Sequence, residues 1–493
     1  MRAANKNPLL YQINTRAWLT AIGRDLGRPA TLDDIPDEEI VRIAGYGFDW
    51  VWFLGVWRTG EAARRVSRSN PEWLAEYRQV LPDLTEDDIA GSCFAITGYD
   101  VRPALGGDAA LSRLRERLAE HGLRLMLDFV PNHVAPDHPW IVEHPDWFVR
   151  GDEEGLAREP HNWCRIVGPE GSAVFAYGRD PYFPGWPDTL QLNYGSQDLQ
   201  AAMRAELVRI AERCDGVRCD MAMLVVPDVF HRTWHIDAPA FWPDAIAAVR
   251  AEHPGFRLMA EVYWDMEWTL QQQGFDYTYD KRLYDRLRGG DARGVREHLV
   301  AGLDFQGRLA RFLENHDEPR AAAVFPRPMH EAATVVAALV PGLRFIQQGQ
   351  MQGRRAHLPT HLIRWPDEPV DEQLQAFYER LLAVLRMPLL HDGAWARLEP
   401  QAAWNGNNSW DGFIACAWRG EDCRLVAAVN YAGSEGQCFV RLPFRELADK
   451  RVRLRDVLSG TVYERAGDSL LSPGLYLDVP AWHYHAFVVE DAG

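Results

Sequence analysis

Short runs of apolar residues alternate with amphipathic stretches over most of the chain. Seven runs are clear, and an eighth at residues 275–280 is weaker; the clear runs lie at residues 9–13, 50–54, 123–130, 216–220, 256–263, 308–315 and 343–349. Between them, apolar residues recur at helical spacing, for example at residues 111–122, 199–214 and 329–342. Strands that alternate with helices predict parallel βαβ units. About eight such units favour an α/β fold of the closed (β/α)8 TIM-barrel type, with two open α/β domains as the alternative.

Two segments depart from this rhythm. Residues 131–198 are rich in Pro, Gly, Trp and His and show little helical periodicity, which is typical of a functional insertion after the third strand. After about residue 389 the chain changes to short alternating strands separated by turns, which predict a C-terminal antiparallel β-sandwich. We therefore expect a barrel from residues 1–130 and 199–388, an inserted B domain at 131–198 and a sandwich at 389–493.

Composition narrows the set of ligands. The chain has 493 residues and a net charge of −17, which argues against nucleic acid and against an anionic membrane surface. No run of about 18 apolar residues predicts a membrane span, and the first residues lack the apolar stretch of a signal peptide. The seven cysteines form no C-x-x-C pair, which is typical of reduced thiols. These features lead us to expect a cytoplasmic protein with a neutral ligand; the oligomeric state stays open.

Four predicted strands end in polar clusters. These are DFVPNH at residues 128–133, GVRCD at 216–220, AEVY at 260–263 and ENHDE at 314–318. Taken singly, each has a plain explanation, such as a helix cap or an ion pair between Arg218 and Asp220. Catalytic groups of a barrel enzyme lie at the carboxyl ends of its strands, so the four clusters in order predict one active site.

Together these clusters resemble the four signature regions of the α-amylase superfamily, glycoside hydrolase family 13. DFVPNH is similar to the first region, GVRCD to the second, AEVY to the third and FLENHD to the fourth. QLNY at residues 191–194 resembles an additional short region near the end of the family's B domain, and ITGYD at 96–100 resembles the segment that places a tyrosine against the innermost sugar. The resemblance runs from about residue 8 to residue 350.

The resemblance implies a retaining mechanism with two carboxyl groups. Asp220 would be the nucleophile that forms a glycosyl-enzyme intermediate, and Glu261 would be the acid/base. Asp317 would hold sugar hydroxyls and stabilise positive charge in the transition state. Arg218 would orient Asp220 and keep it ionised.

Three further residues are implied as contacts to the same sugar. His133 and His316 would hydrogen-bond the ring, and Tyr99 would stack on it. The aromatic residues of the insertion, and Trp264 and Trp268 after Glu261, are further candidates for sugar-packing platforms.

Two departures from the family pattern affect what else is expected. Asn132 is similar to a calcium ligand of many amylases, but the usual Lys-His after the second region is replaced here by Met223 and Leu224. We therefore predict no metal ligands and no obligatory cofactor, with calcium left as an option. The end of the eighth strand, residues 345–350, also differs, and the polar loop at 351–369 is a candidate for shaping the substrate site.

The expected function is α-amylase-type hydrolysis of α-glucans or malto-oligosaccharides. The first alternative is a transglycosylase or maltosyltransferase of the same superfamily, because residues 135–148 resemble an insertion of maltosyl-transferring members and the catalytic residues would be the same. A non-catalytic carbohydrate-binding relative is the second alternative, although all three carboxylates are present.

Overall fold

The computed structural model describes residues 5–168 and 171–492 and contains a closed barrel of eight parallel strands. Around the barrel the strands follow chain order, and each pairs in parallel with the next. They are β1 (Leu9–Asn14), β2 (Trp50–Leu54), β5 (Arg124–Phe129), β10 (Gly216–Cys219), β11 (Arg257–Ala260), β12 (Tyr277–Tyr279), β13 (Leu309–Arg311) and β14 (Leu343–Gln347). The predicted barrel is confirmed, and the alternative of two open sheets is wrong because β14 pairs with β1.

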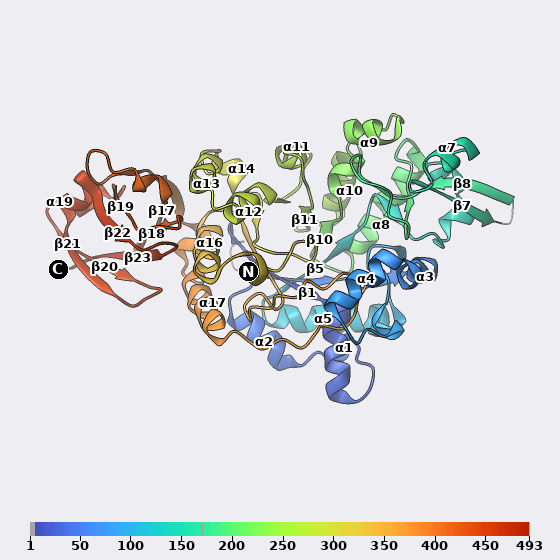
Figure 1. Ribbon diagram of the computed structural model, residues 1–493, viewed down its shortest axis with the longest axis horizontal. Helices are drawn as coiled ribbons and strands as arrows, with labels where there is room; N and C mark the ends of the chain where they lie inside the picture. Colours follow the sequence, from blue (N-terminus) through green and yellow to red (C-terminus); the bar gives the residue numbers. More distant parts are fainter. Residues whose placement is uncertain (1–4, 169–170, 493) are drawn as a thin grey trace.

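Helices cover the outside of the barrel between successive strands (Figure 1). The main ones are α1 (Thr15–Leu26), α2 (Asp37–Gly45), α5 (Gly107–Glu120), α8 (Gln197–Ala211), α10 (Trp242–Glu252), α12 (Lys281–Arg288), α16 (Arg327–Leu339) and α17 (Glu372–Leu385). Local sequence sets their ends. Asn14 caps α1 by accepting a hydrogen bond from the backbone N–H of Ala17, and Gly27 ends the helix with a φ of 67° that favours glycine.

Two connections on the side of the carboxyl ends are long. The connection from β2 to β5 contains β3 (Trp57–Thr59), α3 (Glu61–Ser69), α4 (Pro71–Val80) and β4 (Ile96–Val101). The connection from β5 to α8 contains β6 (His133–Val134), α6 (Trp140–Glu143), α7 (Glu153–Arg158), β7 (Trp163–Gly168), β8 (Gly171–Ala176) and β9 (Leu190–Gln191). β6 pairs with β9, so this insertion returns to the barrel beside the point where it leaves.

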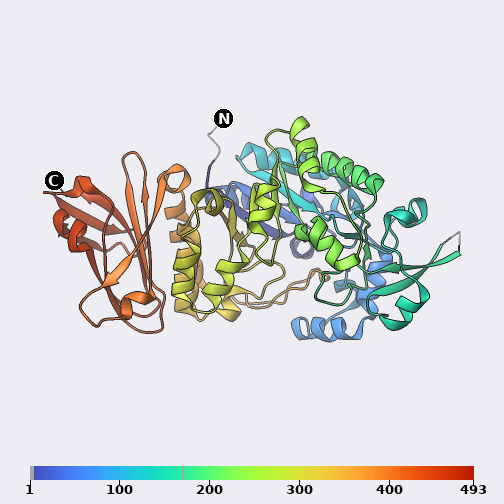
Figure 2. The ribbon, with the colours of Figure 1, turned by 90° about the horizontal axis from the view of Figure 1, so that it is seen from above.

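The C-terminal part is built from two antiparallel sheets that enclose a second apolar core. The six-stranded sheet runs in the order β15 (Ala394–Leu398), β17 (Phe413–Arg419), β18 (Arg424–Asn430), β23 (Tyr484–Asp491), β20 (Arg451–Asp456) and β21 (Val462–Ala466). The smaller sheet has β16 (Pro400–Ala402), β19 (Gly436–Val440) and β22 (Leu475–Val479). Figures 1 and 2 show these sheets at one end of the molecule and the β7–β8 hairpin at the other, with the barrel between them.

The C-terminal sheets contact the barrel through buried side chains. Trp418 donates from Nε1 to the carbonyl of Leu339 at the end of α16, at 2.7 Å, and Tyr431 donates to the carbonyl of Leu287 at 2.6 Å. Both residues are fully buried. Among the described helices, none combines the length and apolar character needed to cross a membrane.

Candidate active site

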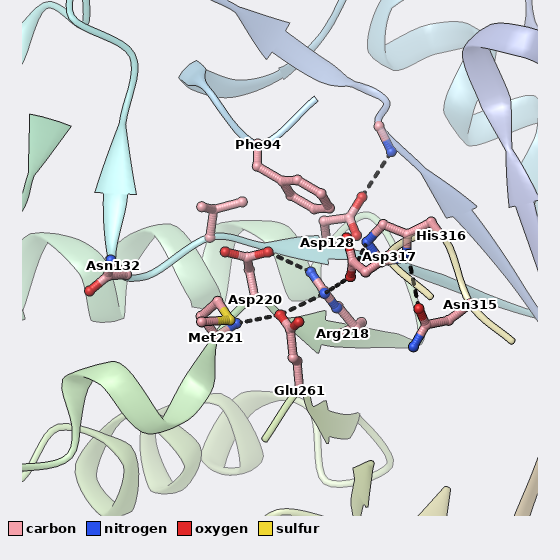
Figure 3. Close-up of polar contacts among 12 residues, drawn as sticks. Phe94, Asp128, Asn132, Arg218, Asp220, Met221, Glu261, Asn315, His316 and Asp317 are labelled. Atoms are coloured by element: carbon pink, nitrogen blue, oxygen red, sulfur yellow. Dashed lines mark hydrogen bonds and ion pairs between the residues drawn. The ribbon is translucent and has the colours of Figure 1, made fainter. Parts of the chain in front are cut away.

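The carboxyl ends of β10, β11 and β13 bring three carboxyl groups together around one arginine (Figure 3). Asp220 directly follows β10, Glu261 directly follows β11, and Asp317 lies in the loop after β13. Arg218 lies inside β10, two residues before Asp220, so both side chains point to the same side of the strand. The order of the barrel strands thus places residues that are distant in sequence at one point.

Arg218 is completely buried and binds the carboxyl groups through both terminal nitrogens. Its Nη1 donates to Asp220 at 2.7 Å, its Nη2 donates to Glu261 at 2.6 Å, and Asp317 lies 3.8 Å from Nη2. The guanidinium also lies over the ring of Phe94, 5.1 Å from its centroid. A rigid planar fork can hold two carboxylates in fixed relative positions, which a lysine cannot do.

Glu261 is held by three donors yet favours its protonated form. Besides Arg218, the backbone N–H of Met221 donates to Oε2 at 2.7 Å and the hydroxyl of Tyr263 donates to Oε1 at 2.9 Å. Burial raises the pKa of Glu261 to about 8, which outweighs the lowering by Arg218, while Asp220 and Asp317 raise it further. A carboxyl group that keeps its proton near neutral pH can serve as a general acid.

His316 and His133 flank the carboxyl groups as neutral imidazoles. His316 accepts a hydrogen bond at Nδ1 from the amide of Gln12 at 2.8 Å, which leaves the proton on Nε2, 3.1 Å from Asp317. His133 Nε2 lies 3.9 Å from Asp220. Burial lowers the pKa of both histidines, so each presents a neutral ring to the site.

Asp128 in β5 supports the site from within the barrel. Its carboxyl oxygens accept hydrogen bonds from Trp52 Nε1 at 3.0 Å and from the backbone of Gly55 at 2.9 Å. Burial raises the pKa of Asp128 to about 7. These contacts anchor the carboxyl end of β2 beside β5 and leave Asp128 outside the cavity lining.

A cavity of about 330 Å³ opens over the carboxyl groups. Its floor is formed by Asp220, Glu261 and Asp317. Its walls come from three connections: Trp73 in α4, Trp186 and Thr189 before β9, and Thr360 and His361 in the loop after β14. The loop at residues 351–369, which the sequence marked as a candidate, therefore does contribute to this cavity.

Tyr99 does not line the cavity, so the geometry gives no support to its predicted position against the sugar. It is 3% exposed, its hydroxyl donates to the carbonyl of Val130 at 3.0 Å, and its ring stacks on Phe129. Within this segment, the aromatic ring that lines the cavity is that of Phe94, five residues earlier, and Trp73, Trp186 and Tyr263 line it from other segments. Pairing of β4 with β3 is irregular in register, so the side chain that faces the site could not be chosen by counting along the strand.

The groups near Asn132 fit an amide and not a calcium ion. The side-chain nitrogen of Gln191 lies 3.0 Å from each of three oxygens, which are Asn132 Oδ1, the Asn132 carbonyl and the Leu192 carbonyl. Calcium needs six to eight oxygen ligands, whereas here a neutral donor already uses these three. Met223 and Leu224 are buried and add no polar side-chain group. Within residues 5–168 and 171–492, no three His, Cys, Asp or Glu side chains are grouped to hold a metal ion.

A closed (β/α)8 barrel with paired carboxyl groups at the carboxyl ends of its strands is the arrangement of a glycoside-active enzyme. The family model for the alpha amylase catalytic domain matches residues 94–381. The chain therefore belongs to the alpha-amylase family, as the signature regions predicted.

Relatives in this family carry two kinds of name. The chain is 26% identical to Alpha-amylase MalA of Haloarcula japonica over 72% of the chain and 50% of that protein. It is 34% identical to an Alpha-1,4-glucan:maltose-1-phosphate maltosyltransferase of Cereibacter sphaeroides over 50% of the chain and 32% of that protein. The chain thus spans half or less of the length of these relatives.

Solved structures of the same fold match over nearly the whole chain. A maltogenic alpha-amylase, AmyB, from Thermotoga neapolitana gives a TM-score of 0.69 at 18% identity, covering 98% of both chains. An alpha-amylase from Geobacillus thermoleovorans, complexed with acarbose, gives 0.68 at 17% identity, covering 100% of both chains. The barrel and the C-terminal sheets of this chain therefore belong to the same fold as these structures.

Proposed function

We propose that this enzyme hydrolyses α-glucosidic bonds in α-glucans or malto-oligosaccharides with retention of configuration. The observation that supports it most directly is the single guanidinium of Arg218, which is hydrogen-bonded to both Asp220 and Glu261. Retaining enzymes need their two carboxyl groups about 5–5.5 Å apart, whereas inverting enzymes leave room for a water molecule between them. The shared guanidinium holds the two carboxyl groups side by side, which supports the retaining mechanism.

In the first step, Glu261 donates its proton to the glycosidic oxygen while a carboxylate oxygen of Asp220 attacks the anomeric carbon. The bond to the leaving sugar breaks, the leaving oxygen takes the proton, and the sugar stays covalently bound to Asp220. Asp317, which lines the cavity, hydrogen-bonds hydroxyls of the sugar in this state, and His316 lies behind it with Nε2 3.1 Å from the Asp317 carboxylate. The carboxylates of Asp220 and Asp317 stabilise the positive charge of the oxocarbenium-like transition state.

In the second step, Glu261 acts as the base. It takes a proton from water, whose oxygen attacks the anomeric carbon and releases Asp220 as a carboxylate. In the proposed mechanism, these side chains handle the protons and the charge of both steps.

Transfer to a second sugar is the alternative outcome of the same intermediate. It is favoured by the 34% identity to proteins named maltosyltransferases. Only the acceptor differs: a sugar hydroxyl would replace water in the second step. The catalytic groups are the same in both cases, so the products must distinguish them.

The products of maltoheptaose digestion test both outcomes. Hydrolysis predicts only shorter maltodextrins, with the α-anomer formed first in a proton NMR time course. Products longer than the substrate at high maltoheptaose concentration would establish transfer, and initial formation of the β-anomer would contradict retention.

Variants of the carboxyl groups test the roles of the residues. Asp220→Asn and Glu261→Gln should each lower kcat by at least about a thousandfold, whereas Asp228→Asn, at an exposed position of α9 (Pro227–Trp234), serves as the matched control. If both active-site variants kept the wild-type rate, neither assignment would stand, and a carbohydrate-binding role without catalysis would be favoured.

A further inference from the structure

A second cavity, of about 490 Å³, lies beside α1 and is lined by five arginines. Arg16 and Arg24 come from α1, Arg28 from the turn after it, Arg64 from α3, and Arg102 from the residue after β4. Asp87 is the one carboxylate in the lining. Such a concentration of positive charge is unexpected in a chain whose net charge is −17.

Three of these arginines have no carboxylate partner in the part of the chain that the structure describes. Arg28 pairs with Asp34 and Arg64 with Glu61, but the ion pairs of the described residues include none for Arg16, Arg24 or Arg102. Structural arginines usually gain a carboxylate when they are clustered, because like charges repel one another. The positive charge of the arginine cluster is therefore not fully neutralised by the protein, and an anion could bind to it.

Arg16 adds a buried positive charge at the edge of the cavity. It is 4% exposed, and its Nη1 has no hydrogen-bond partner among the described residues. Because this nitrogen is itself enclosed by protein, Arg16 contributes charge to the cavity and not a hydrogen bond to a ligand. Burial, together with the positive charges of Arg16 and Arg64, lowers the pKa of Arg102 to about 10.

We propose that this cavity binds the phosphate group of a small molecule, either inorganic phosphate or a sugar phosphate. Guanidinium groups bind phosphate oxygens in paired, charge-assisted hydrogen bonds. The cavity is larger than a phosphate ion needs, and Leu19, Leu105 and Ile363 give it an apolar side against which the remainder of a sugar phosphate can pack.

The phosphate cavity and the active-site cavity share a wall made of two chain segments. The backbone N–H of Ala90 donates to the carbonyl of His361 at 2.9 Å, and Arg16 donates to the carbonyls of Gly91 and Thr360. On one side of this wall, Ala90 and Ile363 line the arginine cavity. On the other side, Ser92, Thr360 and His361 line the active-site cavity.

Isothermal titration of the full chain with inorganic phosphate and with glucose 1-phosphate tests the site, at constant ionic strength and with glucose as the uncharged control. Both phosphates should bind and glucose should not. Equal affinities would identify free phosphate as sufficient, whereas tighter binding of glucose 1-phosphate would show that the apolar side contributes; either result supports the site.

Arginine variants locate the binding. Arg102→Gln should raise the dissociation constant at least about tenfold, and Arg24→Gln, at an exposed position that the fold does not need, should also raise it. Arg158→Gln, an equally conservative change at the exposed end of α7, should leave it unchanged. The site is refuted if the wild-type chain binds neither phosphate at millimolar concentration, or if Arg24→Gln and Arg102→Gln both bind as tightly as wild type.

Discussion

Replacing Glu261 with Gln should stabilise the folded chain near neutral pH. The amide fits the same contacts: its oxygen can accept from Arg218 and from the backbone of Met221, and its nitrogen can donate to the hydroxyl of Tyr263. What the change removes is a carboxyl group that burial makes difficult to ionise. Active-site groups are commonly held at such a cost to stability.

The magnitude follows from the pKa of Glu261, which rises from 4.5 to about 8 on folding. Below pH 4.5 the carboxyl group is protonated in both states and costs nothing. As the pH rises toward 8, the unfolded chain loses this proton while the folded chain keeps it, so the stability of the wild type declines. At pH 7 the loss amounts to about 3 kcal/mol, at roughly 1.4 kcal/mol for each pH unit. The value of about 8 already includes the effect of Arg218, which lowers the pKa of Glu261.

Thermal unfolding at pH 5, 6, 7 and 8 measures this effect. The midpoint of Glu261→Gln should exceed that of the wild type by several degrees at pH 7, with a difference that grows from pH 5 to pH 8. Glu116→Gln, on the exposed face of α5, is the control and should differ from the wild type by about 0.5 kcal/mol or less. A difference that shrinks as the pH rises, or a variant less stable than the wild type at pH 8, would refute the reasoning.

Three further predictions concern catalysis, sugar contacts and metal. Because Glu261 must donate a proton, kcat/KM for maltoheptaose should fall as the pH rises through about 8, the pKa of Glu261, and a profile that is flat to pH 9.5 would contradict the assignment. Phe94→Ala should lower kcat/KM by about three- to tenfold, because a ring contact to the sugar is lost. Tyr99→Phe should leave KM unchanged and lower the free energy of unfolding by about 1 kcal/mol, because only a buried hydrogen bond is lost. A raised KM in Tyr99→Phe with no effect of Phe94→Ala would instead support a sugar contact at Tyr99. EDTA should leave the activity and the thermal unfolding midpoint of the wild type unchanged, and loss of activity in EDTA would contradict this. The unfolding midpoint of Gln191→Glu should rise with added Ca²⁺, because a carboxylate would complete the oxygen cluster around Asn132.

Sequence periodicity predicted most of the barrel because its strands are short, buried on both faces and mainly apolar. The run at residues 50–54 coincides with β2, and even the weak run at 275–280 contains β12. In the C-terminal part, the sequence predicted alternating strands but not their number. β21 is mostly exposed and therefore has no buried face from which an alternating pattern could be recognised.

The polar ends of the strands predicted which residues meet, because strand order in a barrel fixes which carboxyl ends are neighbours. Arg218, Asp220 and Glu261 are one residue or less from a strand, so their positions follow from the strand itself. Phe94 and Gln191 could not be assigned in the same way. Each lies in a long connection whose path depends on contacts between distant segments, such as the pairing of β6 with β9.

The wall that Ala90, Gly91, Thr360 and His361 form separates the active-site cavity from the cavity that we propose binds phosphate, so a change at one face is felt by residues of the other. Any factor by which a bound anion tightens or loosens the oligosaccharide must equal the factor by which the oligosaccharide changes affinity for the anion. A titration at either cavity, repeated with the other one filled, therefore measures the same coupling free energy. The backbone hydrogen bond from Ala90 to His361 is a point at which the size of that coupling can be changed without altering the carboxyl groups.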